Sequence, residues 1–369
     1  MKIIHCADLH LDSKMNTHLS KDKARERKNE LLRTFERMVD YASKNEVTAI
    51  IIAGDLFDTD SVSQKTQNVV IEQIRSHADI SFYYLRGNHD ANNFLSVLEQ
   101  PLDNLFLFSE KSWSSYEIGK DKNIVISGVE LGKTNSDFVY NTLLLDQEKF
   151  NIITLHGQEI ATNSEKSAEL VKIRELKNKG IDYLALGHVH AYKEEALDAR
   201  GTYCYSGCLE GRGFDEIGEH GFVLLNIDED SLKYSRSFIP FALRSLYECE
   251  VDISGSFTTP EILSKIEAFL ADKEIPSDSL VKIILSGEVS AETEKDLEYI
   301  KSRFEGSYYF LRVVDGSKVK VNYDDYEMDQ SLRGEFVRTV KSRMDISEEE
   351  KAQIIHYGLQ AISGEEIVI

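Results

Sequence analysis

The sequence predicts an α/β fold in its first half, followed by a smaller α/β unit and a helical tail. Three observations support this prediction. Apolar runs alternate with amphipathic helical segments up to residue 85, strand-like runs dominate from 123 to 240, and a strand–helix–strand–helix–strand pattern follows residue 244. Such alternation is typical of βαβ units, in which helices cover the faces of a sheet.

The first predicted elements are three strands separated by two helices. Residues 3–6, 49–53 and 80–85 are short apolar runs, and the run at 49–53 is continuous enough to indicate a strand buried on both faces. Residues 23–43 and 63–76 carry apolar side chains on one helical face and charged side chains on the other.

The next region is predicted to be rich in strands and to contain one helix, at 167–179. The strands are expected at 124–126, 152–155, 183–186, 202–205 and 222–225.

The last region is predicted to form a second domain and a tail. Strands at 247–253, 280–286 and 308–314 alternate with helices at 260–273 and 291–304, and two further helices are expected at 330–343 and 347–361. We therefore predict domains at 1–244 and 245–322, with a helical segment at 323–369 that is a candidate for docking a partner.

Composition narrows the class of protein. The chain has 369 residues, of which 41% are hydrophobic and 29% charged, as in ordinary globular proteins. No apolar run approaches the roughly 18 residues of a membrane span, and no signal peptide is recognisable. Four scattered cysteines suit a reducing compartment, so we expect a cytoplasmic protein. Cys204 and Cys208 are the only close pair, which disfavours a structural zinc site.

Five short motifs carry the candidate chemistry, and each directly follows a strand-like run. They are Asp8-Leu9-His10, Gly54-Asp55-Leu56-Phe57-Asp58, Gly87-Asn88-His89-Asp90, His156-Gly157 and Gly187-His188-Val189-His190. Loops that follow strand C-termini in an α/β sheet converge on one crevice, so these motifs are expected to meet. Any one of them alone is weak evidence, because Gly-Asn-His-Asp also suits a simple turn and alternating histidines also occur on surfaces.

The residue types in these motifs predict a dinuclear metal site. The expected ligands are Asp8, His10, Asp55, Asn88, His156, His188 and His190. Mixed nitrogen and oxygen ligands suit manganese, iron or zinc better than calcium or magnesium. Two close metal ions need a bridging group, and the carboxylate of Asp55 is the natural candidate. His89 is expected either to protonate the leaving oxygen or to stabilise the charge that develops there, with Asp90 orienting its ring. Asp58 is expected to cap a turn.

The five motifs together resemble the calcineurin-like metallophosphoesterase superfamily, whose signature is D-x-H, GD-x-x-D, GNH-[DE], H and GH-x-H. The resemblance covers residues 1–190. Within the superfamily, the chain is similar to SbcD-type DNA repair exonucleases in the stretches 8–11, 53–59 and 205–222. It departs from them at Ser206-Gly207-Cys208, where the family often has Pro-Gly-Ser, and in lacking proline after residue 59.

The resemblance implies a two-sheet sandwich flanked by helices, with a smaller C-terminal capping domain. It implies that one metal ion is held by Asp8, His10, Asp55 and His190, and the other by Asp55, Asn88, His156 and His188. It also implies that His89 is the catalytic histidine. The expected cofactor is manganese, with iron, zinc and magnesium as alternatives. The expected partners are DNA, an SbcC-like coiled-coil ATPase and a second copy of the chain.

Two other functions compete with that of a DNA nuclease. The net charge of −21 favours hydrolysis of a small phosphoester, because proteins that bind nucleic acid are usually basic. A non-catalytic scaffold that binds a partner through its C-terminal helices is the third alternative, which the complete ligand set disfavours.

Overall fold

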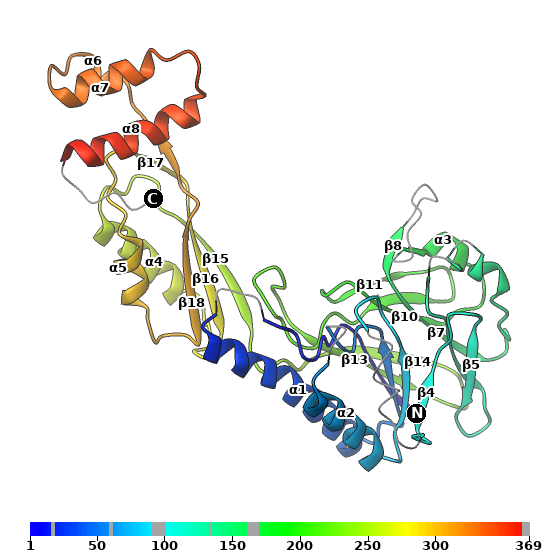
Figure 1. Cartoon of the computed structure of the whole chain (residues 1–369). Coiled ribbons are helices and arrows are strands. Elements are labelled where there is room, and N and C mark those ends of the chain that lie inside the picture. The colour runs from blue at the N-terminus through cyan, green and yellow to red at the C-terminus, as the bar shows by residue number, and fades with distance from the viewer. Residues whose placement is uncertain are drawn as a thin grey trace. The chain divides into compact units, whose positions relative to one another are not determined.

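The computed structural model describes residues 1–15, 19–58, 62–90, 101–132, 135–136, 138–160 and 170–363. The chain divides into two compact units, Met1–Ser245 and Leu246–Ile369 (Figure 1). Hydrophobic clusters form within each unit, so each has a core of its own. None of the helices in the described ranges is long and apolar enough to cross a membrane.

The first sheet of the first unit has six strands in the order β14-β13-β1-β2-β3-β4. The four strands from β1 to β4 run parallel, whereas β13 is antiparallel to both β1 and β14. The bounds are β1 Lys2–Cys6, β2 Ala49–Ala53, β3 Ser81–Leu85, β4 Leu105–Leu107, β13 Gly221–Ile227 and β14 Tyr234–Pro240.

The second sheet has the order β11-β12-β10-β7-β6-β5. Its four central strands run parallel and its two edge strands run antiparallel to their neighbours. The bounds are β5 Ser114–Ile118, β6 Ile124–Gly128, β7 Phe150–His156, β10 Tyr183–Gly187, β11 Lys193–Ala196 and β12 Thr202–Tyr205. The short strands β8 (Gln158–Ile160) and β9 (Leu170–Lys172) pair separately.

The two sheets pack face to face, and helices cover their outer faces. Alternation along β2 shows the layering: Ala49 and Ile51 lie in the cluster shared with the second sheet, whereas Ile50 and Ile52 pack with the helices α1 (Lys21–Lys44) and α2 (Gln64–Ser76). A third cluster covers the second sheet together with the 3-10 helix η2 (Val139–Thr142) and α3 (Ile173–Leu176). The predicted two-sheet sandwich flanked by helices is therefore confirmed.

The helices α1 and α2 each follow a serine that accepts a backbone hydrogen bond. Ser20 accepts from the N–H of Lys23 at the start of α1, and Ser63 accepts from the N–H of Thr66 at the start of α2. Such caps satisfy amide groups that the first helical turn leaves without partners. All four cysteines are free and buried.

Arg27 of α1 is fully buried and pairs with two carboxylates. One guanidinium nitrogen contacts Glu30, and Nη2 donates to Oε2 of Glu210 at 3.2 Å and to the carbonyl of Gly211 at 2.8 Å. Thr34 also donates to Glu210, at 2.7 Å. This network fixes the loop after β12 against α1.

We expect Arg27→Met to lower the free energy of unfolding of the first unit by about 3–5 kcal/mol, because it removes the cation that pairs with the buried carboxylate of Glu210, whereas Glu30 keeps its ion pair with Arg244. Trp113 is the single tryptophan and belongs to this unit, so its fluorescence during urea denaturation reports the change. The exposed Arg25→Met is the control and should shift stability by less than about 0.5 kcal/mol. Equal effects of the two substitutions would contradict the assignment.

The second unit contains a parallel sheet in the order β15-β16-β18, packed against two helices. The bounds are β15 Leu246–Asp252, α4 Thr259–Ala271, β16 Leu280–Ser286, α5 Leu297–Arg303 and β18 Phe310–Asp315. A second cluster joins Ala291 and Val319 to three further helices and is accompanied by a small sheet. These elements are β17 Glu288–Ser290, β19 Lys318–Lys320, α6 Asp324–Glu327, α7 Leu332–Lys341 and α8 Glu348–Ser363.

Two predicted helices are wrong in extent. The helix expected at 167–179 begins in residues 167–169, which lie outside the described part of the chain. Of its described residues, 170–172 form β9 and only Ile173–Leu176 is helical. Pairing of β9 with β8 overrides the local helical pattern. The helix expected at 291–304 begins only at Leu297, because Asp296 caps it by accepting from the N–H of Tyr299.

Candidate metal centre

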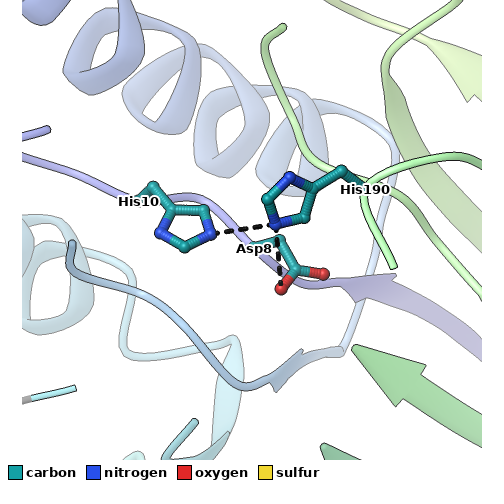
Figure 2. Close-up of side chains that lie close together, drawn as sticks. All are labelled: Asp8, His10 and His190. Carbon is teal, nitrogen blue, oxygen red and sulfur yellow. Dashed lines mark hydrogen bonds and ion pairs between the residues drawn. The ribbon is translucent and has the colours of Figure 1, made fainter. Parts of the chain in front are cut away.

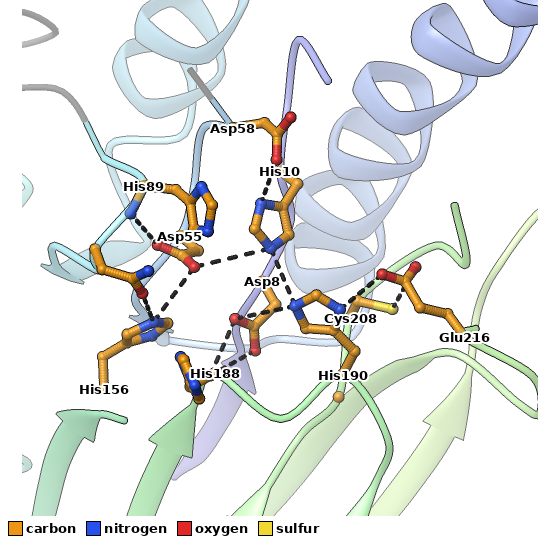
Figure 3. A network of polar contacts seen from close by, with 12 residues as sticks. Asp8, His10, Asp55, Asp58, His89, His156, His188, His190, Cys208 and Glu216 are labelled. Atoms are coloured by element: carbon orange, nitrogen blue, oxygen red, sulfur yellow. Dashed lines mark hydrogen bonds and ion pairs between the residues drawn. The ribbon is translucent and has the colours of Figure 1, made fainter. Parts of the chain in front are cut away.

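The five sequence motifs lie at the C-terminal ends of parallel strands. Asp8, Asp55 and Asn88 follow the neighbouring strands β1, β2 and β3 of the first sheet. His156 ends β7 and His188 follows β10, which are neighbours in the second sheet. The loops of the two sheets therefore bring these side chains to one site, as Figure 3 shows for the labelled Asp8, Asp55, His156 and His188; Oδ1 of Asn88 lies 3.0 Å from Nε2 of His156.

The backbone at this site adopts an uncommon conformation. Asp8, His10, Asp55 and His188 have φ values of 52°, 44°, 51° and 101°, which non-glycine residues rarely adopt. Hydrogen bonds hold the first two loops together, because the N–H of Asp8 donates to the carbonyl of Gly54 and the N–H of His10 donates to the carbonyl of Asp55, both at 3.0 Å. Strain of this kind concentrates at functional sites, where the surrounding fold sustains it.

Glycine is required where the loops approach one another. A Cβ atom on Gly54, whose φ is +96°, would lie 2.1 Å from Nδ1 of His156. A Cβ atom on Gly87 would lie 2.1 Å from Oδ1 of Asp55. Both glycines therefore leave room for predicted ligands.

Two groups of side chains offer atoms that could bind a metal ion, and we call them donor groups. The first donor group consists of Asp8, His10 and His190 (Figure 2). Nδ1 of His10 lies 2.9 Å from Oδ1 of Asp58, and Nδ1 of His190 lies 2.7 Å from Oε1 of Glu216. These carboxylates favour a proton on each Nδ1, which leaves each Nε2 as a donor for a metal ion. The two Nε2 atoms are 3.2 Å apart. When both rings are neutral, the lone pairs of the two Nε2 atoms face each other and repel. A cation that binds both nitrogen atoms removes this repulsion.

The second group consists of Asp8, Asp55 and His156, with Asn88 beside them. Nδ1 of His156 lies 2.9 Å from the carbonyl oxygen of Ala53, which can only accept a hydrogen bond, so Nδ1 carries a proton. Nε2 of His156 lies 3.0 Å from Oδ1 of Asn88 and 3.3 Å from Oδ2 of Asp55. Three potential ligand atoms thus converge.

Asp55 belongs to the second group and also lies close to His10 of the first. Its Oδ2 atom lies 3.3 Å from Nε2 of His156 and 3.8 Å from Nε2 of His10, while its Oδ1 atom accepts a hydrogen bond of 2.9 Å from the N–H of His89. One oxygen therefore lies close to a histidine of each group. This is the arrangement that a bridging carboxylate requires.

The remaining predicted residues line the same site. The N–H of His188 donates to both oxygens of Asp8, at 3.0 and 2.9 Å, and its ring lies edge-on to His156 at 5.4 Å between centroids. His89 is exposed, and its ring lies edge-on to His10 at 5.2 Å. His89 also offers a ligand atom close to His10 and Asp58, so proximity alone leaves its role open.

Asp90 has a different position from the one predicted. Its two carboxylate oxygens accept hydrogen bonds of 2.8 Å from the backbone N–H groups of Phe57 and Gly87, so it fastens the two loops together instead of orienting the ring of His89. Burial is the main cause that raises the pKa of Asp90, and the charge of Asp55 adds to it, so the pKa reaches about 6 although the hydrogen bond from Gly87 lowers it.

In the absence of metal, the charges of Asp55 and His156 stabilise each other and shift both pKa values. Burial opposes ionisation of Asp55, but the hydrogen bond from His156 and the charges of His156 and His10 lower its pKa to about 2. Burial also opposes protonation of His156, but Asp55 and Asp8 raise its pKa to about 9. At neutral pH without metal, the ring of His156 therefore carries a second proton, on Nε2, in addition to the one on Nδ1. A metal ion that binds Nε2 must displace this second proton.

We expect the apparent metal affinity to rise as pH increases from 6 to 9. Below its pKa of about 9, His156 is protonated, so lowering the pH strengthens competition by the proton, up to about tenfold per pH unit for one proton. Calorimetric titration of metal-free protein with Mn²⁺, in buffers of different ionisation enthalpy, counts the protons released. An affinity that does not change with pH, without proton release, would contradict this protonation state.

Sequence reasoning missed three residues that support the ligands. Asp58 contacts His10, where only a turn cap was expected. Glu216 contacts His190, and Arg212 contacts both Asp58 and Glu216. The one signal was that Arg212 and Glu216 lie within the stretch 205–222 that carries the resemblance to SbcD-type exonucleases.

The donor set fits divalent metal ions. It combines imidazole nitrogens, carboxylate oxygens and an amide oxygen, a mixture that suits manganese, iron and zinc. Histidine rings whose second nitrogen faces a carboxylate or a backbone carbonyl are the usual form of metal-binding histidines. His10, His190 and His156 all have such a partner.

Comparison with known proteins agrees with this geometry. Residues 1–192, which include every predicted ligand, match the calcineurin-like phosphoesterase family. Over 251 residues the chain is 28% identical to the metallophosphoesterase YhaO of Bacillus subtilis, covering 63% of this chain and 59% of that protein.

Two further relatives have names that refer to nucleases or DNA repair. The chain is 26% identical over 270 residues to the DNA double-strand break repair protein Mre11 of Aeropyrum pernix, covering 68% of this chain and 64% of that protein. It is 25% identical over 293 residues to a component of the nuclease SbcCD of Staphylococcus epidermidis, covering 70% of this chain and 73% of that protein. The matches span less than two thirds of the length of YhaO and of Mre11.

Proposed function

Since the chain belongs to the calcineurin-like phosphoesterase family, we propose that it is a metal-dependent nuclease that hydrolyses phosphodiester bonds in DNA. The observation that carries this proposal is the position of Oδ2 of Asp55, 3.3 Å from His156 and 3.8 Å from His10. One carboxylate oxygen that faces two donor groups supports a pair of metal ions that share a ligand.

The residues of the site divide into ligands and a proton donor. Two bound divalent ions supply Lewis acidity, which polarises a phosphoryl group and favours deprotonation of water. The proposed ligands are Asp8, His10, Asp55, Asn88, His156, His188 and His190. The exposed ring of His89, beside His10, supports its assignment as the group that protonates the leaving oxygen. Asp90 supports that loop through Gly87.

The proposed cofactor is a pair of manganese ions, with iron, zinc and magnesium as the alternatives. Imidazole and carboxylate donors in one site support manganese over calcium, which prefers an all-oxygen shell.

Relatives supply the support for DNA as the substrate and for an assembly. The names of two relatives refer to DNA double-strand break repair and to one component of a nuclease. We propose that this chain acts as an exonuclease in DNA repair, as a homodimer with an SbcC-like ATPase. In this proposal residues 245–322 cap the bound DNA, and the helices within 323–369 dock the ATPase.

Hydrolysis of a small phosphodiester is the second candidate function, and the net charge favours it. At −21 the chain repels the phosphate backbone of DNA, whereas a small substrate meets mainly the field of the bound metal ions.

End-labelled single- and double-stranded DNA, incubated with the full chain and Mn²⁺, distinguishes the two functions. The nuclease function predicts shortening of DNA that Asp55→Ala abolishes. Hydrolysis of bis(p-nitrophenyl) phosphate and cyclic nucleotides, with DNA left intact under every metal tested, would overturn it in favour of the second function.

A further inference from the structure

Arg212 joins two carboxylates that each contact a different histidine of the first donor group. Nη1 of Arg212 donates to Oδ1 of Asp58 at 2.9 Å, and Nη2 donates to Oε1 of Glu216 at 2.8 Å. The same Oδ1 of Asp58 lies 2.9 Å from Nδ1 of His10, and the same Oε1 of Glu216 lies 2.7 Å from Nδ1 of His190. One guanidinium thus connects both histidine rings through the two carboxylates. Figure 3 labels these carboxylates and histidines.

The donors of Arg212 are directed at these carboxylates. Its Nε also donates to Oε1 of Glu216, at 3.1 Å, and its backbone N–H donates to Oε2 of the same residue at 2.7 Å. The side chain is 20% exposed. A guanidinium engaged in this way positions neighbouring groups, in contrast to a free one that would bind a substrate phosphate.

Hydrogen bonds and an ion pair hold the loop that carries Arg212 in place. The neighbouring carbonyl of Gly211 accepts a hydrogen bond from the buried Arg27, and Glu210 pairs with the same arginine. His220 contacts the backbone carbonyl of Glu216 through Nε2 at 2.8 Å. The segment from Arg212 to Glu216 is therefore held at both ends. The forked guanidinium of Arg212 can then set the positions of the carboxylates of Asp58 and Glu216.

The second donor group has no such connection among the described residues. Nδ1 of His156 faces the backbone carbonyl of Ala53, and Oδ1 of Asp55 accepts from the backbone N–H of His89. Main-chain atoms orient this group, whereas side-chain carboxylates orient the first.

We propose that Arg212 is a positioning residue that couples His10 to His190 and selectively strengthens binding of the metal ion held by Asp8, His10 and His190. The inference rests on the proposed metal centre but is independent of whether DNA is the substrate. Without the fork, the carboxylates of Asp58 and Glu216 repel each other, and the two rings lose their common orientation. The ion at Asp55, Asn88 and His156 keeps its ligands and their main-chain partners.

Calorimetric titration of metal-free full chain with Mn²⁺ tests this inference through the number of ions and the affinity of each. We expect two ions in the unmodified protein. In Arg212→Gln we expect one ion to bind about 10- to 100-fold more weakly, the usual effect of removing a partner of a ligand, and the other ion to keep its affinity within about twofold. Arg212→Lys, which keeps the charge but has no planar fork, should restore only part of the loss.

Arg200→Gln is the matched control, because Arg200 forms a fork with Asp182 (two contacts of 2.8 Å) next to the opposite end of β10. It should leave both ions unaffected. Equal weakening of both ions in Arg212→Gln, full recovery in Arg212→Lys, or no change at all would overturn the inference. Should Arg212→Gln fail to fold, the comparison between Arg212→Lys and the unmodified protein decides. Fewer than two ions in the unmodified protein would overturn the metal centre itself, whereas selective weakening without DNA cleavage would overturn only the nuclease function.

Discussion

Replacing Asp55 with alanine is expected to remove both metal ions and to lower phosphodiester hydrolysis by about 10³-fold or more. Oδ2 of Asp55 lies 3.3 Å from Nε2 of His156 and 3.8 Å from Nε2 of His10, so its loss should remove a ligand from each ion. Metal ions contribute several kcal/mol to catalysis of this kind, and each 1.4 kcal/mol or so changes a rate tenfold. Metal content by mass spectrometry and turnover of a chromogenic diester measure the two effects.

The control for this substitution is Asp182→Asn, at the residue before β10, where the carboxylate pairs with Arg200. It should leave metal content unchanged, because His188 lies beyond the other end of the same strand. Retention of both ions in Asp55→Ala would show that the carboxylate does not bridge them.

Replacing His89 with alanine is expected to lower turnover by about 10²- to 10⁴-fold while metal content stays near normal. Loss of a positioned proton donor has an effect of this size. The backbone N–H of His89, which donates to Oδ1 of Asp55, survives the substitution, so the carboxylate of Asp55 keeps this hydrogen bond. The measurements are the metal-to-protein ratio and turnover with substrates whose leaving groups differ in pKa.

A good leaving group needs little protonation, so the defect of His89→Ala should shrink with p-nitrophenyl esters and be largest with poor leaving groups. His89→Gln serves as the comparison, since it fills the same space but cannot donate a proton as an acid. A loss of metal in His89→Ala as large as in Asp55→Ala would make His89 a ligand, which its proximity to His10 and Asp58 also permits.

Much of the site was predictable because its residues follow buried strands. The apolar runs before Asp8, Asp55 and His188 identify strands, and the C-terminal ends of parallel strands meet. The supporting residues were not predictable in this way. Arg212 and Glu216 lie in an irregular loop after β12, where no periodic pattern indicates which side chains face His190.

Asp90 shows the limit of inference from neighbours in sequence. Its place next to His89 suggested a contact with that ring, but its carboxylate reaches back to the N–H of Gly87 and across to Phe57. A buried carboxylate that accepts two amide hydrogen bonds closes a tight loop, and a short polar side chain favours such local backbone contacts. The helix expected at 167–179 was wrong for a related reason, since the pairing of β8 with β9 outweighs a local periodic pattern.

The most direct test of the account is a crystal structure of the full chain with Mn²⁺, with the ions located by anomalous scattering. We predict two peaks about 4 Å apart. One should be bound by Asp8, His10 and His190, the other by Asn88, His156 and His188, with Asp55 bound to both. A single ion, or two ions that do not share Asp55, would contradict the central claim that this chain holds a dinuclear centre bridged by one carboxylate.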